Sequence, residues 1–265
     1  MRKKEIGLEE LKKIELQTLQ AVHAFCEQRG LHYYLWGGTL LGAIRHGGFI
    51  PWDDDIDIAM PRADFEIFLK EFDSKNYGVC YCTTDHRYPY WHAKVYDKAT
   101  VKDEEGYYKK GFSLGVDVDI FVLDNYTDKE AVVATTNWRF RRLEQCNISR
   151  LSAKTGPWLR RIGGIVGRCI LGMDANATAR AANNKAKSFG KDGDGLMLYA
   201  DANVRTPLFL ERSWFENRIL HKFEDTGFYI PAGYDGLLNA CYGDYMTPPP
   251  VEKQIPHHNF VAYYK

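Results

Sequence analysis

The residues best suited to chemistry lie between Tyr34 and Pro61, where two aspartates, Asp55 and Asp57, alternate with isoleucines. On a β-strand, residues two apart share a face, so these acids should point the same way, about 6–7 Å apart along the chain. Two carboxylates aimed at one place repel each other unless something positive lies between them. Mg²⁺ or Mn²⁺ carrying the phosphates of a substrate is the occupant that this arrangement favours.

A second run repeats the alternation, because Asp117 and Asp119 are interleaved with Val116, Val118 and Ile120. Such a strand buries its apolar residues and presents its acids on the other face. Lying beside the first strand, it would supply a third carboxylate ligand, either Asp117 or Asp119. Three carboxylates from two adjacent strands, next to a glycine turn, are the signature of the nucleotidyltransferase fold.

The glycine turn is Gly37-Gly38, which joins an expected strand at 32–36 to an expected helix at 40–46. A strand that delivers glycines to a helix start can bring bare backbone N–H groups against a phosphate. We therefore expect Gly37, Gly38 and the Thr39 hydroxyl to hold phosphate oxygens. The simpler alternatives are a plain turn for the glycines and a solvated loop for the acids. They fit less well because apolar residues surround the acids.

Three cations are candidates to bind the same phosphates: Arg45, Arg62 and Lys94. Arginine suits two-pronged contacts with phosphate. Lys94 lies in an expected strand at 91–96, where it would face the carboxylates, although a surface lysine is an equally simple interpretation. Trp52, directly before the acids, is assigned to substrate contact as well.

Four residues invite a zinc site, since thiols and imidazoles are the ligands that zinc prefers: Cys80, Cys82, His86 and His92. However, Cys80 and Cys82 are also alternate residues of an expected strand, where small buried thiols are common. We favour that simpler interpretation. The six cysteines include no CxxC pair, which fits reduced thiols in a cytoplasmic protein.

Composition narrows the class of protein. The chain of 265 residues is 45% hydrophobic and has a formal net charge of zero. Zero net charge argues against nucleic-acid binding by charge alone. The first residues lack the apolar segment of a signal peptide, and we find no apolar stretch of about 18 residues that would span a membrane.

Periodicity predicts an α/β (α+β) fold: a nucleotidyltransferase-like mixed sheet flanked by helices, with a helical insertion. Residues 1–126 form the catalytic core, which begins with a long amphipathic helix. Residues 127–200 are predicted to form a helical, basic segment on the side of the domain that binds the acceptor. Its part at 138–172 could lie on an anionic membrane, although packing against the domain is the simpler alternative. Residues 201–265 return to strands and a proline-containing tail that complete the same domain.

The order of the motifs resembles the LicD family. The motifs are GGTLLGAIRHGGFIPWDDDIDIAMPR, AKVYDKAT, VDVDIFVLD, FE at 223–224, YGDYMTPPP and a closing HH. Members are bacterial transferases that move phosphocholine, or a related phospho-alcohol, from a CDP-activated donor to a glycan, and fukutin and its relatives share the core. The resemblance covers nearly the whole chain from Glu9 and is weakest between Thr127 and Tyr199.

The resemblance implies catalytic and metal-binding roles for Asp55, Asp57 and Asp119, because the family's IDIF pattern falls on residues 118–121. Asp117 stands where the family more often has an apolar residue, and it remains the alternative third ligand. Asp53 would support the site without catalysing the reaction. The third carboxylate could also act as general base toward the acceptor hydroxyl.

The partners implied are a CDP-alcohol, CDP-choline first, and a glycan or lipid-linked glycan such as a teichoic-acid or lipopolysaccharide precursor, with peripheral contact at the inner membrane face. Choline would rest on aromatic faces, for which the candidates are Trp36, Trp52, Tyr90 and Trp91.

Three other functions fit parts of the pattern. A nucleotidyltransferase would use the same metal site to move NMP from an NTP to a small molecule or protein, releasing pyrophosphate in place of CMP. A metal-dependent glycosyltransferase has a DxD motif but needs neither the glycine turn nor the VDVDIF strand. A binding module has no reason to keep acids that repel one another.

Overall fold

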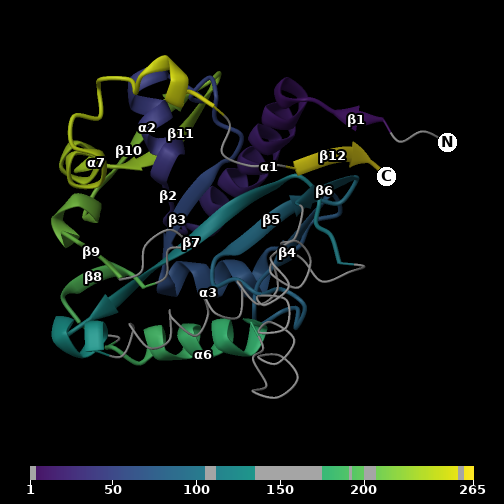
Figure 1. Ribbon diagram of the computed structural model, residues 1–265. Coiled ribbons are helices and arrows are strands. Elements are labelled where there is room, and N and C mark those ends of the chain that lie inside the picture. The colour runs from purple at the N-terminus through teal and green to yellow at the C-terminus, as the bar shows by residue number, and fades with distance from the viewer. Residues whose placement is uncertain (1–3, 105–111, 135–174, 191–192, 200–206, 256–259) are drawn as a thin grey trace, which may run out of the picture.

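The centre of the molecule is a mixed β-sheet. The structure is a computed structural model and describes residues 4–104, 112–134, 175–190, 193–199, 207–255 and 260–265. In this described part the sheet has seven strands, ordered β2-β3-β7-β5-β4, with β8 paired to β7 and β9 to β8 (Figure 1). Their bounds are β2 Tyr34–Leu35, β3 Asp57–Pro61, β4 Tyr77–Cys80, β5 Ala93–Asp97, β7 Asp117–Tyr126, β8 Gly195–Leu198 and β9 Leu208–Leu210.

β7 organises the sheet because three strands pair with it. β3 pairs with β7 in parallel. β5 pairs antiparallel with residues 117–120 of β7, and β8 pairs antiparallel with residues 123–126. The register sets Asp57 of β3 and Lys94 of β5 on either side of Asp119. Residues that alternate with the acids, such as Ile58 and Ile120, are fully buried. Pairing with β3 and β5 therefore brings the charged residues of three strands together at one place.

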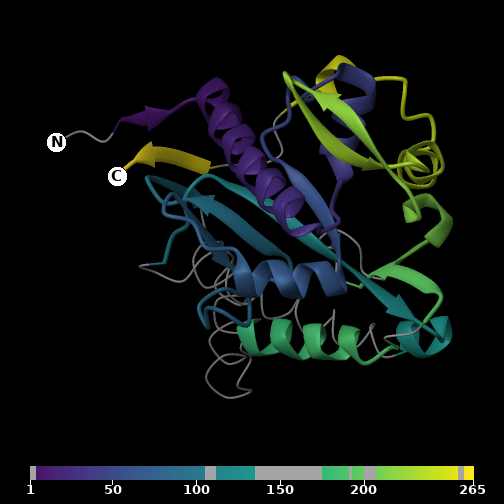
Figure 2. The ribbon, with the colours of Figure 1, turned by 180° about the vertical axis from the view of Figure 1, so that it is seen from behind.

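Helices cover this sheet. α1 (Leu8–Arg29) and α3 (Arg62–Glu71) lie across the face seen in Figure 2, and α6 (Ala175–Lys187) runs below them. α1 forms because apolar residues recur at helical spacing, and Leu11 and Leu19 are completely buried. The helix ends at Gly30, whose φ of 65° suits a left-handed cap.

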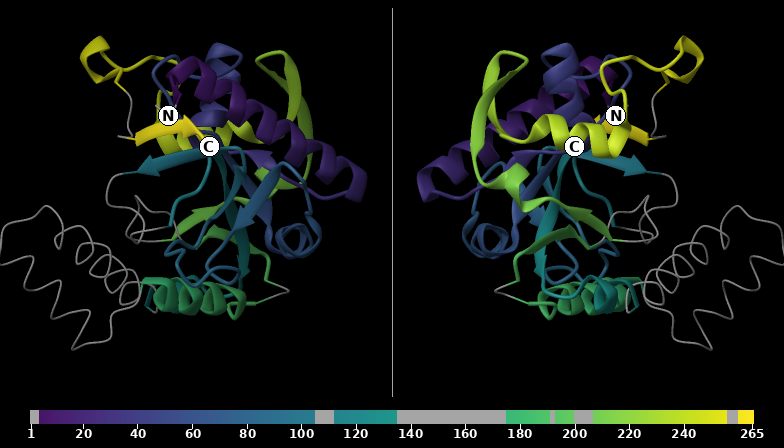
Figure 3. Two further views of the ribbon diagram at one scale, coloured as in Figure 1. Left: turned by 90° about the vertical axis from the view of Figure 1, so that its right-hand side faces the viewer. Right: turned by 90° about the vertical axis from the view of Figure 1, so that its left-hand side faces the viewer.

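The remaining elements form two smaller units. α2 (Gly37–His46), η1 (Arg212–Phe215), the hairpin of β10 (Arg218–Phe223) and β11 (Thr226–Pro231), and α7 (Tyr234–Tyr242) lie together. In Figure 3 the hairpin, α7, α1 and α2 occupy the upper half of the molecule, opposite α6. A three-stranded sheet of β1 (Glu5–Ile6), β12 (Phe260–Tyr264) and β6 (Thr100–Glu104) brings the two ends of the described chain together, and η2 spans Val251–Lys253.

The fold class predicted from the sequence is confirmed, with differences in detail. The first helix, the strands that carry the acids and the helix that begins at Arg62 are all present. Residues 127–200 are not helical throughout, because Gly195–Leu198 is a strand of the main sheet with three buried apolar side chains. The basic segment at 138–172 lies outside the described residues. Among those that are described, no helix is both long enough and apolar enough to cross a membrane.

Candidate active site

Backbone hydrogen bonds fix the first acidic strand against α2. Asp57 begins β3; its carbonyl oxygen accepts the Trp36 N–H at 3.0 Å, and its own N–H donates to the Thr39 hydroxyl oxygen at 2.8 Å. Thr39 is buried, so its hydroxyl oxygen serves the strand. We had expected it to face phosphate. Asp55, which the sequence predicts on the same strand face as Asp57, instead precedes the strand in the connecting segment.

The glycine pair makes room for two carboxylates. Gly37 has a φ of +53°, and a Cβ there would lie 3.1 Å from Oδ2 of Asp57. A Cβ on Gly38 would lie 2.7 Å from Oδ2 of Asp53, closer than real Cβ atoms approach. Both carboxylates therefore lie against the first turn of α2, where the helix dipole favours negative charge. Phosphate oxygens carried by a cation would meet the same electropositive turn.

Replacing Gly38 with alanine should displace Asp53. We expect the Gly38→Ala variant to lose about 1–3 kcal/mol of unfolding free energy through overpacking, and turnover to fall about tenfold or more as the carboxylate shifts. Urea unfolding and the transfer assay described below measure the two effects. The matched control is Gly7→Ala, because a Cβ on Gly7 meets no atom within 4 Å. Parental turnover by Gly38→Ala would show that the position of Asp53 is unimportant.

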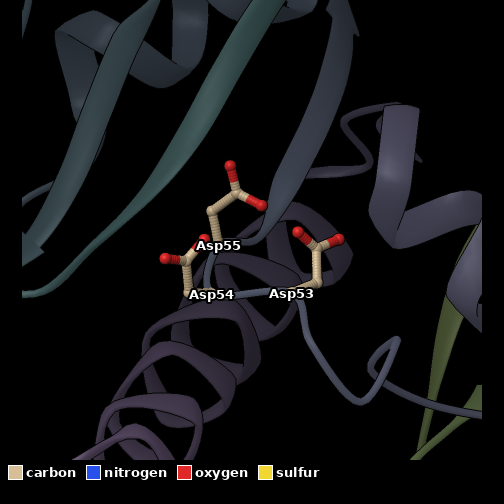
Figure 4. A group of neighbouring side chains, drawn as sticks. All are labelled: Asp53, Asp54 and Asp55. Atoms are coloured by element: carbon tan, nitrogen blue, oxygen red, sulfur yellow. The ribbon is translucent and has the colours of Figure 1, made fainter. Parts of the chain in front are cut away.

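Three consecutive acids crowd the segment before β3. Asp53, Asp54 and Asp55 each place a carboxylate oxygen within 4.8 Å of the others, and Figure 4 shows Asp53 and Asp54 on either side of Asp55. Asp54 is buried, whereas the other two are partly open. Burial, and then the charges of Asp55 and Asp54, raise the pKa of Asp53 to about 7.

Asp57 experiences the same crowding from both strands. Burial raises its pKa well above the usual value, and the carboxylates of Asp55, Asp119 and Asp53 raise it further, while Lys94 opposes the shift. Carboxylate oxygens are the donors that Mg²⁺ or Mn²⁺ prefers. Among the described residues, the three carboxylates that all come within 4.8 Å of one another are those of Asp53, Asp54 and Asp55, and Asp57 and Asp119 are not part of that group. The residues present therefore fit a divalent cation.

Two buried lysines neutralise the second pair of acids. Lys94 contacts Asp117 and also reaches Oδ1 of Asp119 at 2.7 Å, and Lys102 lies 3.4 Å from Asp117. Burial alone would raise the pKa of Asp117, but Lys102 and Lys94 outweigh it and lower the pKa to about 2. Asp117 is thus held between two lysines, whereas Asp119 lies beside Asp57. This placement favours Asp119 over Asp117 as the third ligand.

His92 is a neighbour of Asp119 that the sequence did not reveal. Its Nε2 lies 3.6 Å from Oδ2 of Asp119, and its ring stacks on Tyr90 with centroids 5.2 Å apart. From the sequence, His92 was predicted only as a possible zinc ligand. Cys80 and Cys82 are buried, which raises the pKa of each thiol to about 12. In the described part of the chain the zinc candidates do not gather into a metal-binding group.

Helix α1 also buries polar residues that no sequence motif singled out. Lys12, Glu15 and Thr18 share one side of the helix, and all three are buried. Burial raises the pKa of Glu15 well above its usual value, although Lys102 opposes the shift. The available signal was the spacing: polar residues at i, i+3 and i+6 lie near the apolar stripe of a helix.

A cleft of about 1040 Å³ opens between the acids and the part of the chain from α7 to Pro249. One wall holds the glycine pair and most of the expected site residues, and the other is formed by α7 and the segment after it. Arg45 bridges the walls by donating to the Tyr245 carbonyl oxygen at 2.8 Å. The predicted residues that line the cleft are Trp36, Gly37, Gly38, Arg45, Trp52, Asp55 and Asp57, and Asp53, Phe121, Leu237, Tyr242 and Tyr245 line it as well. Asp119, which lies beside Asp57 in the register of the two strands, does not line it.

Other predicted residues are not brought to the cleft. Arg62 makes two hydrogen bonds to Asp124, at 2.7 and 2.8 Å, and a third to Asn183 at 2.9 Å. It lines a small separate cavity together with Trp91. These contacts commit Arg62 to joining α3, β7 and α6. Tyr90 packs on His92 and does not line the cleft either.

The geometry can now be set beside known proteins. Residues 30–145 match the family described as "LicD/FKTN/FKRP, nucleotidyltransferase domain". The chain is 32% identical over 272 residues to the "Lipopolysaccharide cholinephosphotransferase LicD" of Haemophilus influenzae, a match that covers 98% of this chain and 99% of that protein. It is 48% identical over 48 residues to the human "Ribitol 5-phosphate transferase FKRP", covering 18% of this chain and 10% of that protein.

These matches, on a fold that gathers carboxylates at the edge of a cleft, define the class of protein as an enzyme of the phosphotransferase type. The chain belongs to the LicD family. The resemblance drawn from the sequence motifs is confirmed.

Proposed function

We propose that this enzyme transfers a phospho-alcohol, phosphocholine first, from a CDP-activated donor to a hydroxyl of a cell-surface glycan precursor. The observation that carries the proposal is the register of β3 and β7, which sets Asp57 beside Asp119 at the glycine turn. The near full-length similarity to a lipopolysaccharide cholinephosphotransferase supports the choice of phosphocholine. Lipopolysaccharide or teichoic-acid precursors are the acceptors we propose, reached as lipid-linked glycans at the inner membrane face.

Asp55, Asp57 and Asp119 would hold Mg²⁺ or Mn²⁺. When bound, such an ion neutralises the pyrophosphate of the donor and stabilises the departing CMP. The chain's own residues bind and orient the donor. The first turn of α2 would face the phosphates of the donor. Arg45 also lines the cleft, and its guanidinium group would bind the same phosphates.

The shape and lining of the cleft suit a nucleotide-alcohol. Its volume of about 1040 Å³ is at the upper end of the range for small-molecule sites. Trp52 and Tyr242 both line the cleft, and an aromatic face attracts a quaternary ammonium. We therefore assign the choline group to this aromatic part of the cleft and the pyrophosphate to the acidic part.

The test is a panel of donors incubated with the protein and Mg²⁺: CDP-choline, CDP-ribitol, CDP-glycerol, CDP-ethanolamine, ATP and GTP, each with and without lipopolysaccharide. We expect one CDP-alcohol to raise the melting temperature and to release CMP, with the phospho-alcohol recovered on the glycan. Pyrophosphate release from ATP or GTP would instead favour the nucleotidyltransferase named in the family description. Silence with every donor and acceptor would contradict both functions.

A further inference from the structure

The loop at 47–52, with the sequence GGFIPW, determines where the acids lie. It leaves α2 at Gly47 and runs directly into Asp53, whose N–H donates to the Ile50 carbonyl oxygen at 2.9 Å. Asp53 and Asp55 follow with no regular element between them and the loop. Any movement of this loop is therefore passed on to the carboxylates.

Glu224 holds one side of the loop from the tip of the β10–β11 hairpin. Its Oε1 accepts the Phe49 N–H at 2.9 Å, and its own N–H donates to the Gly47 carbonyl oxygen at 2.9 Å. A Cβ on Gly48 would come within 2.0 Å of the same carboxylate, so the hairpin tip fits the loop closely.

The backbone of Glu224 is strained in this position. Its φ of 56° makes it the one residue other than glycine with a positive φ in the described chain. A non-glycine residue in this region costs on the order of 1–3 kcal/mol and persists where its surroundings over-determine it. Glu224 is the first of the two residues that join β10 to β11, a position where hairpin turns take a positive φ, and its paired hydrogen bonds join this turn to the loop.

Lys12 holds the other side of the loop from α1. Its ammonium group donates to the Pro51 carbonyl oxygen at 3.0 Å and to the Ile50 carbonyl oxygen at 3.3 Å, and it lies 5.2 Å from the centre of the Phe49 ring. Only 9% of Lys12 is exposed. A buried ammonium is costly unless its donors are used, and here two of them go to successive carbonyls of the loop.

We propose that Lys12 and Glu224 form a clamp on the 47–52 loop that positions the carboxylate of Asp55 for metal binding and the supporting carboxylate of Asp53 beside it. Neither residue lines the cleft, so both are positioning residues that act through the loop. The metal-binding step rests on the proposed function. The clamp itself rests on the hydrogen bonds that join two segments, 37 and 175 residues away from Phe49, to one loop.

The experiment compares Lys12→Met and Glu224→Met with the parent. Both variants keep the length of the side chain but remove its polar contact. We expect the dissociation constant for Mn²⁺, measured calorimetrically without substrate, to rise about 10–100-fold, the range found when partners of metal ligands are removed. We expect kcat to fall with little change in donor KM, and amide exchange at residues 49–55 to quicken. The melting temperature should stay near that of the parent, since Lys12→Met removes a buried charge.

Matched controls separate positioning from bulk charge. Asp225→Asn changes the same hairpin turn, where the Asp225 carboxylate accepts the Thr226 hydroxyl, and Lys13→Met changes an exposed neighbour on α1. Both should match the parent. Glu224→Gln keeps an acceptor for the Phe49 N–H and should restore Mn²⁺ affinity to within a few-fold.

Each outcome is decisive. Unchanged Mn²⁺ affinity and kcat in both clamp variants would overturn the proposal, as would a parent that binds no Mn²⁺ at all. A large loss of melting temperature in both variants would also overturn it, because the residues would then serve the fold. A parent whose Mn²⁺ affinity depends on the clamp but which transfers no phospho-alcohol would remove the proposed function and leave the clamp standing.

Discussion

Asp57→Asn is expected to reduce transfer by more than about 100-fold, beyond the loss caused by removing a partner of a metal ligand. Asp57 lines the cleft, lies beside Asp119 in the parallel register and contacts the glycine turn. An asparagine keeps the shape but removes the negative charge that would hold a cation. The donor panel, run with Mg²⁺, measures the effect.

The same substitution is expected to stabilise the metal-free protein near neutral pH. Burial and the neighbouring acids raise the pKa of Asp57 well above 3.8, so the folded chain binds this proton more tightly than the unfolded chain does. The free energy of unfolding therefore falls as the pH rises from about 4 through the folded pKa. The Asn variant lacks this penalty.

Urea unfolding with EDTA at pH 5 and pH 8 tests this second effect. The advantage of Asp57→Asn over the parent should be larger at pH 8. The control is Asp73→Asn, which removes the same charge from an exposed site outside the cleft. If Asp57→Asn kept near-parental turnover, the assigned metal site would be wrong, and a destabilised metal-free variant would contradict the repulsion that we infer between the acids.

The sequence was most informative where function depends on local periodicity. Alternation of acids with β-branched residues predicted two acidic strands. The structure pairs them so that Asp57 meets Asp119, although Asp55 lies before β3 and not on it. The glycine pair was predicted from its place between a strand and a helix. Its neighbours were not, because the carboxylates against Gly37 and Gly38 come from residues 15 to 20 positions further along.

What the sequence could not give is the partner of each charged side chain. Periodicity says which face a residue occupies but not what lies opposite. Arg62 and Lys94 were both expected to meet phosphate, yet Arg62 pairs with Asp124, 62 residues away, and Lys94 lies between Asp117 and Asp119. The short strands β6, β8 and β12 were not predicted from the sequence, for a related reason. They are stabilised by pairing with distant strands, and five residues or fewer carry little periodic signal.

The substitution Lys94→Met distinguishes two roles for this lysine, which are binding phosphate and neutralising the acids Asp117 and Asp119. If Lys94 bound phosphate, Lys94→Met would weaken donor binding and leave the fold unchanged. In the structure its ammonium is buried against two acids, with only 6% of the residue exposed. We therefore expect Lys94→Met to lower the unfolding free energy by about 3–5 kcal/mol, the cost of leaving a buried charge without its partner. Lys102 still lies near Asp117, which favours the lower end of this range.

A second substitution identifies the cause of that loss. Adding Asp117→Asn to Lys94→Met removes a buried charge that Lys94 had neutralised, and it should recover at least about 1 kcal/mol, because contacting residues are not additive. Lys98→Met is the control, since Lys98 is exposed on the turn after β5 and its ammonium group donates to the Ser74 carbonyl oxygen; the variant should stay within about 0.5 kcal/mol of the parent. Transfer should fail in Lys94→Met because Asp119 loses the cation that fixes it beside Asp57. A stable Lys94→Met protein with a raised donor KM would restore the phosphate-binding role.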